Sequence, residues 1–569
     1  MKVSLLMRLG IPIGGEEARG ASHGAVAQPR WYAALALLLS ATVCGGACNS
    51  NSSATPDGGS HTPPGDSGKP LPEASTAFGV SVLEHHLHPS RDGFYTDPAI
   101  TQAAAANVKI ETGFQATVTG IIYGQPLYVD GWKTGQDAIF IATDHNHVTA
   151  LDATSGAVLW DKTLGPFVTQ MGFLPCGGPY PYYGVTATPI IDMTTRTLYA
   201  ESFQTPDGGT TFKHYLYALS IDDGSVKTGF PVDIAASVPG FTAEIQHDRG
   251  ALALIGGTVY IPYAGLNGDC EAYHGWVVGV NAADPTKVAA YSTSATRGGI
   301  WGAVTSDGTS AYAVTGNTSG ASTWGGGEAL IRFNPGPQFS GATKDYFTPS
   351  NWQTMDDEDA DLGSSPAVFF DVPGATPSTL ALAAGKEGVA HLLNRGDLGG
   401  IGTGNGTTGE GLFSMSVTGG VPGDEIKGTP AAYTTGEGTY VVVRATQGNT
   451  QTGVISVCPN GTSGDLLALR VVPSSPPTLT PAWCASSHGA GAPIATTTGN
   501  GSNVMVWIFA AQGTNELLAF DGDTGAPIFT GGGPAGMLPG PVEHWTSPIV
   551  AKGRFIIGGE NAVYALTAM

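Results

Sequence analysis

The chain has 569 residues, of which 84 are glycine and 39 are proline, and only 12% are charged. This composition suits many short strands joined by tight turns and disfavours long helices. The formal net charge of −22 argues against nucleic acid or an anionic membrane surface as a partner, because binding either one needs clustered lysine and arginine.

The first 48 residues have the features of an export signal. Three arginines precede an apolar run over residues 31–43, which is shorter than the ~20 residues of a membrane-spanning helix. The run leads to Cys48, and residues 49–77 are rich in Ser, Gly and Pro, as expected of a flexible tether. This arrangement resembles a bacterial lipoprotein signal, which implies a lipid anchor at Cys48 in the cell envelope, in the periplasm, at the outer membrane or on the cell surface. An ordinary secreted protein is the alternative.

A phrase of three β runs recurs about eight times in the remaining chain, residues 78–569. Each copy opens at a proline or small residue, and several close on an aliphatic-Ala-Leu-Asp phrase such as Val148-Thr-Ala-Leu-Asp152. The openers lie about 52 to 64 residues apart, at Pro126, Pro189, Ala251, Ala303, Pro366, Pro430, Pro493 and Pro548. A fixed period of this size indicates radial repetition of four-stranded blades. We therefore predict an all-β fold, an eight-bladed β-propeller of four-stranded antiparallel blades, closed by an N-terminal strand from about Val108 to Gly120.

Four cysteines follow the signal, and an even number in an oxidising compartment favours disulfides. We expect Cys458 to pair with Cys484 and Cys176 to pair with Cys270. The sequence contains no Cys-x-x-Cys-His haem attachment motif. Electrons from any redox reaction would therefore leave on an external acceptor.

Polar and aromatic residues gather at equivalent positions of the repeats. In a propeller, the loops that enter the innermost strands and the hairpins between the second and third strands meet on one face around the axis. The entry loops contain His247, Asp248, Arg249, Trp301, Asp359, Asp361, Lys427, His488, His544 and Trp545. The hairpins add His145, Asn146, His147, Glu271, His274, Asn317, Trp324, Lys386, Glu387, Gln512 and Asn561. We expect a functional site on this face, with ordinary solvated loops as the alternative.

Some of these residues lie in motifs of a known family. The phrase Ala150-Leu-Asp-Ala-Thr-Ser-Gly-Ala-Val-Leu-Trp160 resembles the tryptophan-docking repeat of quinoproteins, the pyrroloquinoline quinone dehydrogenases with eight blades. Two longer stretches are similar to the parts of those enzymes that hold the quinone and calcium. They are residues 300–324, with Tyr312-Ala-Val-Thr-Gly-Asn317, and residues 359–395, with Asp359-Ala-Asp-Leu-Gly-Ser-Ser-Pro366 and Ala384-Gly-Lys-Glu-Gly388.

The resemblance implies roles for individual residues. It implies pyrroloquinoline quinone and calcium as cofactors, with Asp361 and Lys386 as catalytic residues. The implied quinone contacts are Trp301, Asn317, Lys386 and Trp545, and the implied calcium ligands are Asn317, Asp361 and Glu271. Such roles suit the chemistry, because an indole offers a flat apolar face to a planar ring and calcium prefers oxygen ligands. A carboxylate can accept an alcohol proton, and a lysine can stabilise charge on a reduced quinone.

Two functions of different classes therefore stand. The first is an exported dehydrogenase that oxidises an alcohol, sugar or polymer by hydride transfer to the quinone. The second is a noncatalytic envelope scaffold or binding lipoprotein, since propellers of the outer-membrane assembly type carry similar repeats. The set of Trp301, Asn317, Asp361 and Lys386 favours the first. The lack of a vicinal cysteine pair in the first-blade hairpin, where Asp144-His-Asn-His147 stands instead, favours the second.

Overall fold

The computed structural model describes Leu71 and residues 80–169, 174–176, 180–266, 271–403, 410–419, 423–448 and 450–568. They all belong to one structural unit, Pro63–Met569. The expected export signal over residues 1–48 and nearly all of the expected tether over residues 49–77 lie outside the described residues, so both stay predictions. No helix of the described part is long and apolar enough to cross a membrane.

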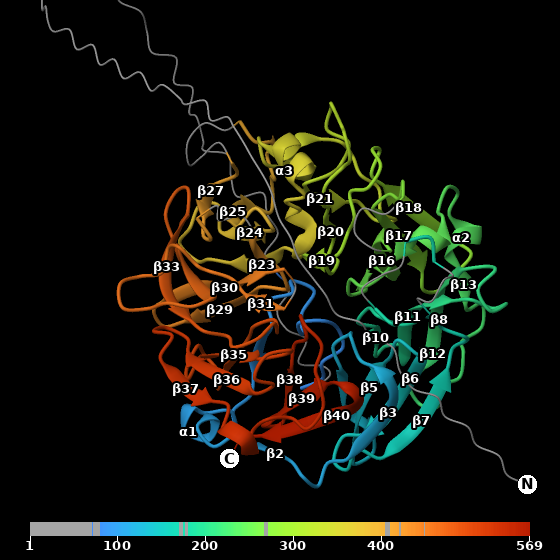
Figure 1. Cartoon of the computed structure of the whole chain (residues 1–569), viewed down its shortest axis with the longest axis horizontal. Helices are drawn as coiled ribbons and strands as arrows, with labels where there is room; N and C mark the ends of the chain where they lie inside the picture. Colours follow the sequence, from blue (N-terminus) through green and yellow to red (C-terminus); the bar gives the residue numbers. More distant parts are fainter. Residues whose placement is uncertain are drawn as a thin grey trace, which may run out of the picture. The chain divides into compact units, whose positions relative to one another are not determined.

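Eight sheets surround a central axis as the blades of a propeller, which confirms the predicted fold (Figure 1). Neighbouring strands of each blade pair antiparallel, starting from an innermost strand. Blades 1 to 4 are formed by β4–β7 (Leu127–Lys133, Gln136–Ala142, His147–Asp152, Val158–Thr163), β10–β13 (Ile190–Asp192, Thr197–Gln204, Lys213–Ser220, Val232–Asp233), β15–β18 (Ala253–Ile255, Thr258–Gly265, Trp276–Asn281, Val288–Ser292) and β19–β22 (Thr305–Ser306, Ala311–Val314, Leu330–Phe333, Tyr346–Thr348).

The second half of the ring repeats this pattern. Blades 5 to 8 are formed by β23, β24, β25 and β27 (Val368–Asp371, Thr379–Ala384, Val389–Asn394, Phe413–Ser416), β29, β30, β32 and β33 (Ala431–Thr435, Gly438–Gln447, Leu466–Val472, Thr478–Ala485), β34–β37 (Ile494–Thr497, Met505–Phe509, Leu517–Asp521, Pro527–Thr530) and β38–β40 (Ile549–Ala551, Arg554–Gly558, Glu560–Thr567).

Short extra elements decorate the blades, so several sheets have more than the four strands predicted for them. The extra strands are β1 (Phe94–Thr96), β8 (Val168–Thr169), β9 (Tyr182–Tyr183), β14 (Gln246–His247), β26 (Gly400–Ile401), β28 (Asp424–Ile426) and β31 (Gln451–Thr452). The α-helices are α1 (Gln102–Ala105), α2 (Ile234–Ser237) and α3 (Trp352–Glu358). The helices are short, as the glycine-rich composition predicts.

Strands in the middle of a blade are apolar on both faces, because each blade packs against two neighbours. All five residues of β35 are buried, for example. The turn that follows the Ala-Leu-Asp phrase supplies a docking point for a tryptophan of the preceding blade. The Trp160 indole donates a hydrogen bond to Ile221 O (2.9 Å) and packs on Gly224, where a Cβ would lie 2.8 Å from the ring. Gly224 has φ +70°, so the turn needs glycine for both its conformation and this contact.

The ring closes between the chain termini. Strands β2 (Lys109–Ile110) and β3 (Ala116–Ile121) pair antiparallel with β40, the last strand of blade 8. This pairing confirms the predicted closing strand, and it removes the exposed edge that blade 8 would otherwise present.

One predicted disulfide is present. Cys458 and Cys484 are bonded with a Cα–Cα distance of 5.6 Å, within blade 6. Cys270 lies outside the described residues, so its pairing with Cys176 stays a prediction.

Candidate functional site at the propeller axis

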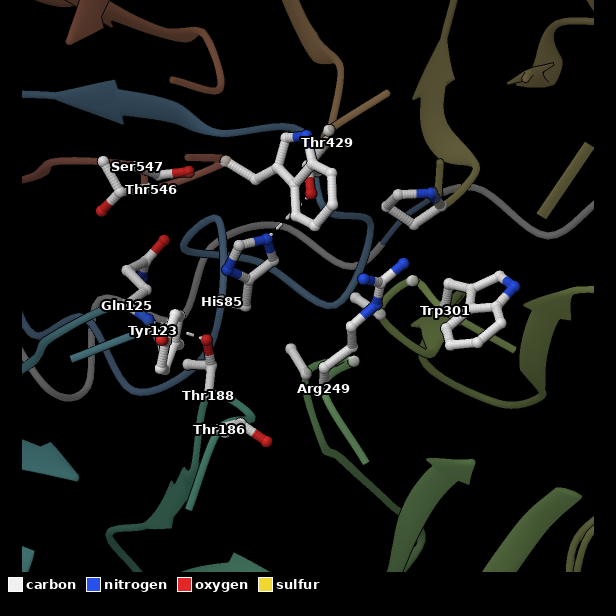
Figure 2. Close-up of a pocket in the computed structure, with 18 of the residues that line it drawn as sticks. His85, Tyr123, Gln125, Thr186, Thr188, Arg249, Trp301, Thr429, Thr546 and Ser547 are labelled. Carbon is white, nitrogen blue, oxygen red and sulfur yellow. Dashed lines mark hydrogen bonds between the residues drawn. The ribbon is translucent and has the colours of Figure 1, made fainter. Parts of the chain in front are cut away.

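A cavity of about 100 Å³ lies on the axis, where the loops that open the blades meet (Figure 2). Its lining comes from seven blades and from the segment that precedes blade 1. The lining residues at the openers are Gln125, Thr188, Ala251, Ala303, Pro366, Thr429 and Thr546. His85, from the preceding segment, also lines the cavity, and its Nε2 lies 2.9 Å from the Thr429 hydroxyl. Equivalent positions of distant repeats thus converge on one small space.

Two indoles and a guanidinium face this cavity. The Arg249 guanidinium carbon lies 4.5 Å from the Trp301 ring centroid and 4.9 Å from the Trp545 ring centroid. Trp301 lies against the backbone of Gly299, where a Cβ would come within 2.9 Å of the ring. No carboxylate of the described residues forms an ion pair with Arg249, so the two aromatic rings are its main neighbours. The site therefore combines flat apolar faces with a cation that lacks an acidic partner.

The Asp361 carboxylate and the Lys386 ammonium form an ion pair of 2.6 Å. Asp359 accepts a second hydrogen bond from Lys386 at 3.0 Å, and Asp361 Oδ1 accepts one from the Asn317 backbone N–H at 2.8 Å. Burial alone would lower the pKa of Lys386, but the two aspartates outweigh burial and raise it. Lys386 therefore remains charged at any physiological pH.

A backbone contact links this ion pair to the indole of Trp301. Gly316 N–H donates to Gly299 O at 2.9 Å, and a Cβ on Gly316 would lie 2.3 Å from Asp361 Oδ1. Trp301 thus packs on one partner of the Gly299–Gly316 contact and Asp361 packs on the other. These close approaches need glycine at both positions, because any side chain would displace a group of the site.

Two acidic residues near Asp361 have no counterpart among the predicted site residues. Glu328 is fully buried and accepts a hydrogen bond from Leu362 N–H at 2.6 Å. Burial, followed by repulsion from Asp361, raises its pKa well above the usual value. Burial also raises the pKa of Asp356 to about 6. The acidic run over residues 356–359 is the only sequence signal for the cluster of Glu328, Asp356 and Asp361. No motif marks Glu328.

The predicted calcium ligands do not form one cluster. Asn317 and Asp361 are neighbours, but Glu271 is exposed in the hairpin between β16 and β17 and makes no hydrogen bond or ion pair with either. The described residues contain no group of three or more His, Cys, Asp or Glu side chains that could hold a metal ion. Lys386 supplies the positive charge beside Asp361. Calcium binding therefore stays a prediction.

Positive charge gathers around the axis even though the chain is strongly acidic. Burial, together with repulsion from Arg249, Arg444 and Lys427, lowers the pKa of His544 to about 4. Burial also lowers the pKa of Lys427, and Lys386 and Arg249 add to this effect despite the Glu425 ion pair. Lys386 and Lys427 are paired with carboxylates, so Arg249 is the cation at the cavity without an ion-pair partner among the described residues.

These groups fit the chemistry of a planar, anionic quinone. Trp301 and Trp545 offer stacking faces, and Arg249 has donors for a carboxylate. The volume is the limiting feature, because cavities for drug-sized ligands measure roughly 300–1,000 Å³. The Arg249 guanidinium occupies the space over the Trp301 ring, 4.5 Å from its centroid.

Solved structures share this fold. The quinohemoprotein alcohol dehydrogenase of Pseudomonas putida HK5 matches with a TM-score of 0.55 and 12% identity, over 86% of this chain and 80% of that one. The quinohemoprotein alcohol dehydrogenase of Comamonas testosteroni matches with a TM-score of 0.53 and 15% identity, over 87% and 81%. A europium-containing methanol dehydrogenase matches with a TM-score of 0.53 and 13% identity, over 84% and 90%. No protein-family model matches the sequence, and a search of curated proteins found no match. The chain therefore has the fold of quinoprotein alcohol and methanol dehydrogenases.

Proposed function

We propose that this propeller binds pyrroloquinoline quinone in the axial cavity and oxidises an alcohol, a sugar or a polymer with it. The observation that carries the proposal is the convergence of Trp301, Trp545 and Arg249 on the axial cavity. The Asp361–Lys386 ion pair does not line the cavity, and the Gly316–Gly299 hydrogen bond links it to Trp301. The fold shared with quinoprotein dehydrogenases supports the same assignment.

In this proposal, Trp301 stacks on one face of the quinone. Arg249 would hold a carboxylate of the ligand through a charge-assisted hydrogen bond in place of its cation–π contacts. Trp545 would offer a second aromatic face to the ligand.

In this proposal, the Asp361–Lys386 ion pair takes part in proton transfer. Pyrroloquinoline quinone, when bound, would supply the acceptor for the hydride of the substrate alcohol. Asp361 accepts the hydroxyl proton at Oδ2, and Lys386 holds this carboxylate in place through their 2.6 Å contact. Lys386 also places a permanent positive charge beside the site, which stabilises negative charge that develops there.

Calcium has two candidate ligands in this proposal, the side chains of Asn317 and Asp361. Calcium prefers six to eight oxygen ligands, so further donors would have to come from water or from the quinone. Glu271 is not among the donors that lie beside Asp361.

The location and partners are further parts of the proposal. The signal-like N-terminus supports an exported chain of the cell envelope with a lipid anchor at Cys48. An external carrier would accept the electrons. The acidic chain is not suited to binding nucleic acid.

A noncatalytic binding or scaffold propeller is the second candidate. The observation in its favour is the small cavity, in which Arg249 takes the space beside both indoles. The shared fold does not separate the two candidates, because one fold hosts many functions.

The test is a dye-linked dehydrogenase assay of the purified full-length protein with a panel of alcohols and sugars. The assay is run with pyrroloquinoline quinone, with calcium, with both and with neither. The proposal expects turnover only in samples that contain the quinone. A protein that binds the quinone without turnover on any substrate would favour the scaffold.

A further inference from the structure

Residues Val82–Asp97, which we name the axial plug, run through the middle of the ring (Figure 1). The innermost strand of a blade has a free inner edge, and its backbone N–H groups point into the channel without a partner from the blade. Carbonyl oxygens of the axial plug accept hydrogen bonds from such groups at 2.8–3.0 Å. The donors are Tyr128, Ile191, Ser306, Phe369, Ala432 and Ala495, and the acceptors are Val82, Leu83, Pro89, Ser90, Asp92 and Gly93, respectively.

The two remaining blades contact the plug through side chains. Arg91 is completely buried, and it donates to Leu252 O of the blade 3 entry at 3.0 Å and to Val304 O of the blade 4 entry at 2.9 Å. In blade 8, Gly553 N–H donates to Asp97 Oδ2 at 2.7 Å. One segment therefore contacts all eight blades.

The plug lies directly beside the axial cavity. Each of its six backbone contacts falls two or three residues after a blade opener. In seven of the blades, the opener or a residue just before it lines the cavity. His85 is part of the plug and also lines the cavity. Gln125 lines the cavity and contacts the plug, since it accepts a hydrogen bond from His86 N–H at 3.0 Å.

We propose that the axial plug fixes the innermost strands of the eight blades relative to one another and closes the channel beside the cavity. A ligand then enters the cavity from one mouth only, and His85 forms part of the opposite wall. If the proposed function holds, the substrate is a small molecule or the end of a chain. A polymer threaded through the axis is excluded.

Hydrogen exchange measured by mass spectrometry on the full-length protein tests this proposal. In the wild type, the six donor amides should exchange as slowly as the amides of the central strand β35. They are read from the peptides that contain Tyr128, Ile191, Ser306, Phe369, Ala432 and Ala495. Exchange at the rate of exposed loops in the folded protein would overturn the proposal.

The variants Arg91→Met and Arg91→Lys test whether the plug acts as one unit. We expect exchange at the six amides to become at least tenfold faster together, with a smaller effect for lysine. A change confined to blades 3 and 4, which Arg91 itself contacts, would overturn a ring-wide role. Arg395→Met is the matched control, because Arg395 is also buried but pairs with Asp371 in blade 5. The measurement needs no ligand, so its failure is distinct from failure of the proposed function, which appears as absent quinone binding.

Discussion

The channel of this propeller has two levels that differ in the groups facing the axis. At the level of the axial plug, backbone N–H groups of six blades find carbonyl partners, although the His85 Nδ1, His86 Nδ1 and Tyr95 hydroxyl atoms of the plug are buried without one. At the level of the cavity, Arg249 has no acidic partner and Trp545 Nε1 has no hydrogen-bond partner among the described residues. Unpaired donors near a cavity cost stability unless a ligand meets them. The comparison indicates a rigid base beneath a site that is prepared for a ligand.

Removal of the Arg91 guanidinium from the plug should have the largest effect, a loss of stability. In Arg91→Met, the partly buried Glu84 carboxylate loses its 2.8 Å ion-pair partner, and two buried carbonyls lose their donor. We expect the free energy of unfolding to fall by about 3 to 5 kcal/mol, the range for breaking a buried pair, as measured by denaturant unfolding. Lys287→Met, at an exposed ion pair, should change it by less than about 0.5 kcal/mol. A similar small change in Arg91→Met would contradict the account.

At the cavity level, Asp361→Asn should have the strongest effect on activity. The amide keeps the shape of the side chain but cannot accept the alcohol proton, so we expect turnover to fall by about 100-fold or more. Quinone affinity, measured by titration, should stay nearly unchanged because the stacking faces remain. Asp284→Asn, at an exposed turn, is the control and should keep full activity. Undiminished turnover in Asp361→Asn would remove this residue from the reaction.

Trp301→Ala should act on binding. Loss of the stacking face should weaken quinone binding by roughly 1 to 3 kcal/mol, the range for stacking of planar bases on aromatic side chains. Isothermal titration calorimetry measures the change. Trp324→Ala is the control, because Trp324 stacks on Tyr346 and does not line the cavity. Equal affinities for the two variants would show that the quinone does not rest on Trp301.

The smallest expected effect is the contribution of His544 to the pH dependence of stability. The pKa of His544 is about 4 in the folded protein, below the ordinary 6.5, so the unfolded chain binds more protons between these two values. Its contribution to stability is therefore lost as pH falls from about 6.5 towards 4, by about 1 kcal/mol at pH 5.5. Unfolding curves of wild type and His544→Gln between pH 7 and 5 should show a shallower pH dependence in the variant. Parallel curves would mean that His544 is protonated without cost in the folded state.

The blades could be predicted from the sequence because the residues that define each blade lie close together along the chain. The turn Asp152-Ala-Thr-Ser-Gly156 and the following Trp160 form a local phrase, and Trp160 docks on the equivalent turn of the next blade, at Ile221 and Gly224. The closing strand and the Cys458–Cys484 bond also follow from position along the chain.

The axial site was only partly visible in the sequence. Asp361 and Lys386 lie in motifs, but Glu328 sits in a loop without one and reaches Asp361 only through the fold. The sequence places Arg249 in an entry loop, but its contact with Trp545 depends on how blades 3 and 8 are rotated about the axis. The plug could not be predicted, because its hydrogen bonds use backbone carbonyls, which carry no sequence signature.

Calorimetric titration of pyrroloquinoline quinone into the purified full-length protein distinguishes a quinone-binding propeller from a scaffold. We expect saturable binding of one quinone per chain, weakened in Trp301→Ala and in Arg249→Gln. Absence of saturable binding to the wild type, with and without calcium, would rule out the quinone site and leave the propeller as a binding or scaffold protein.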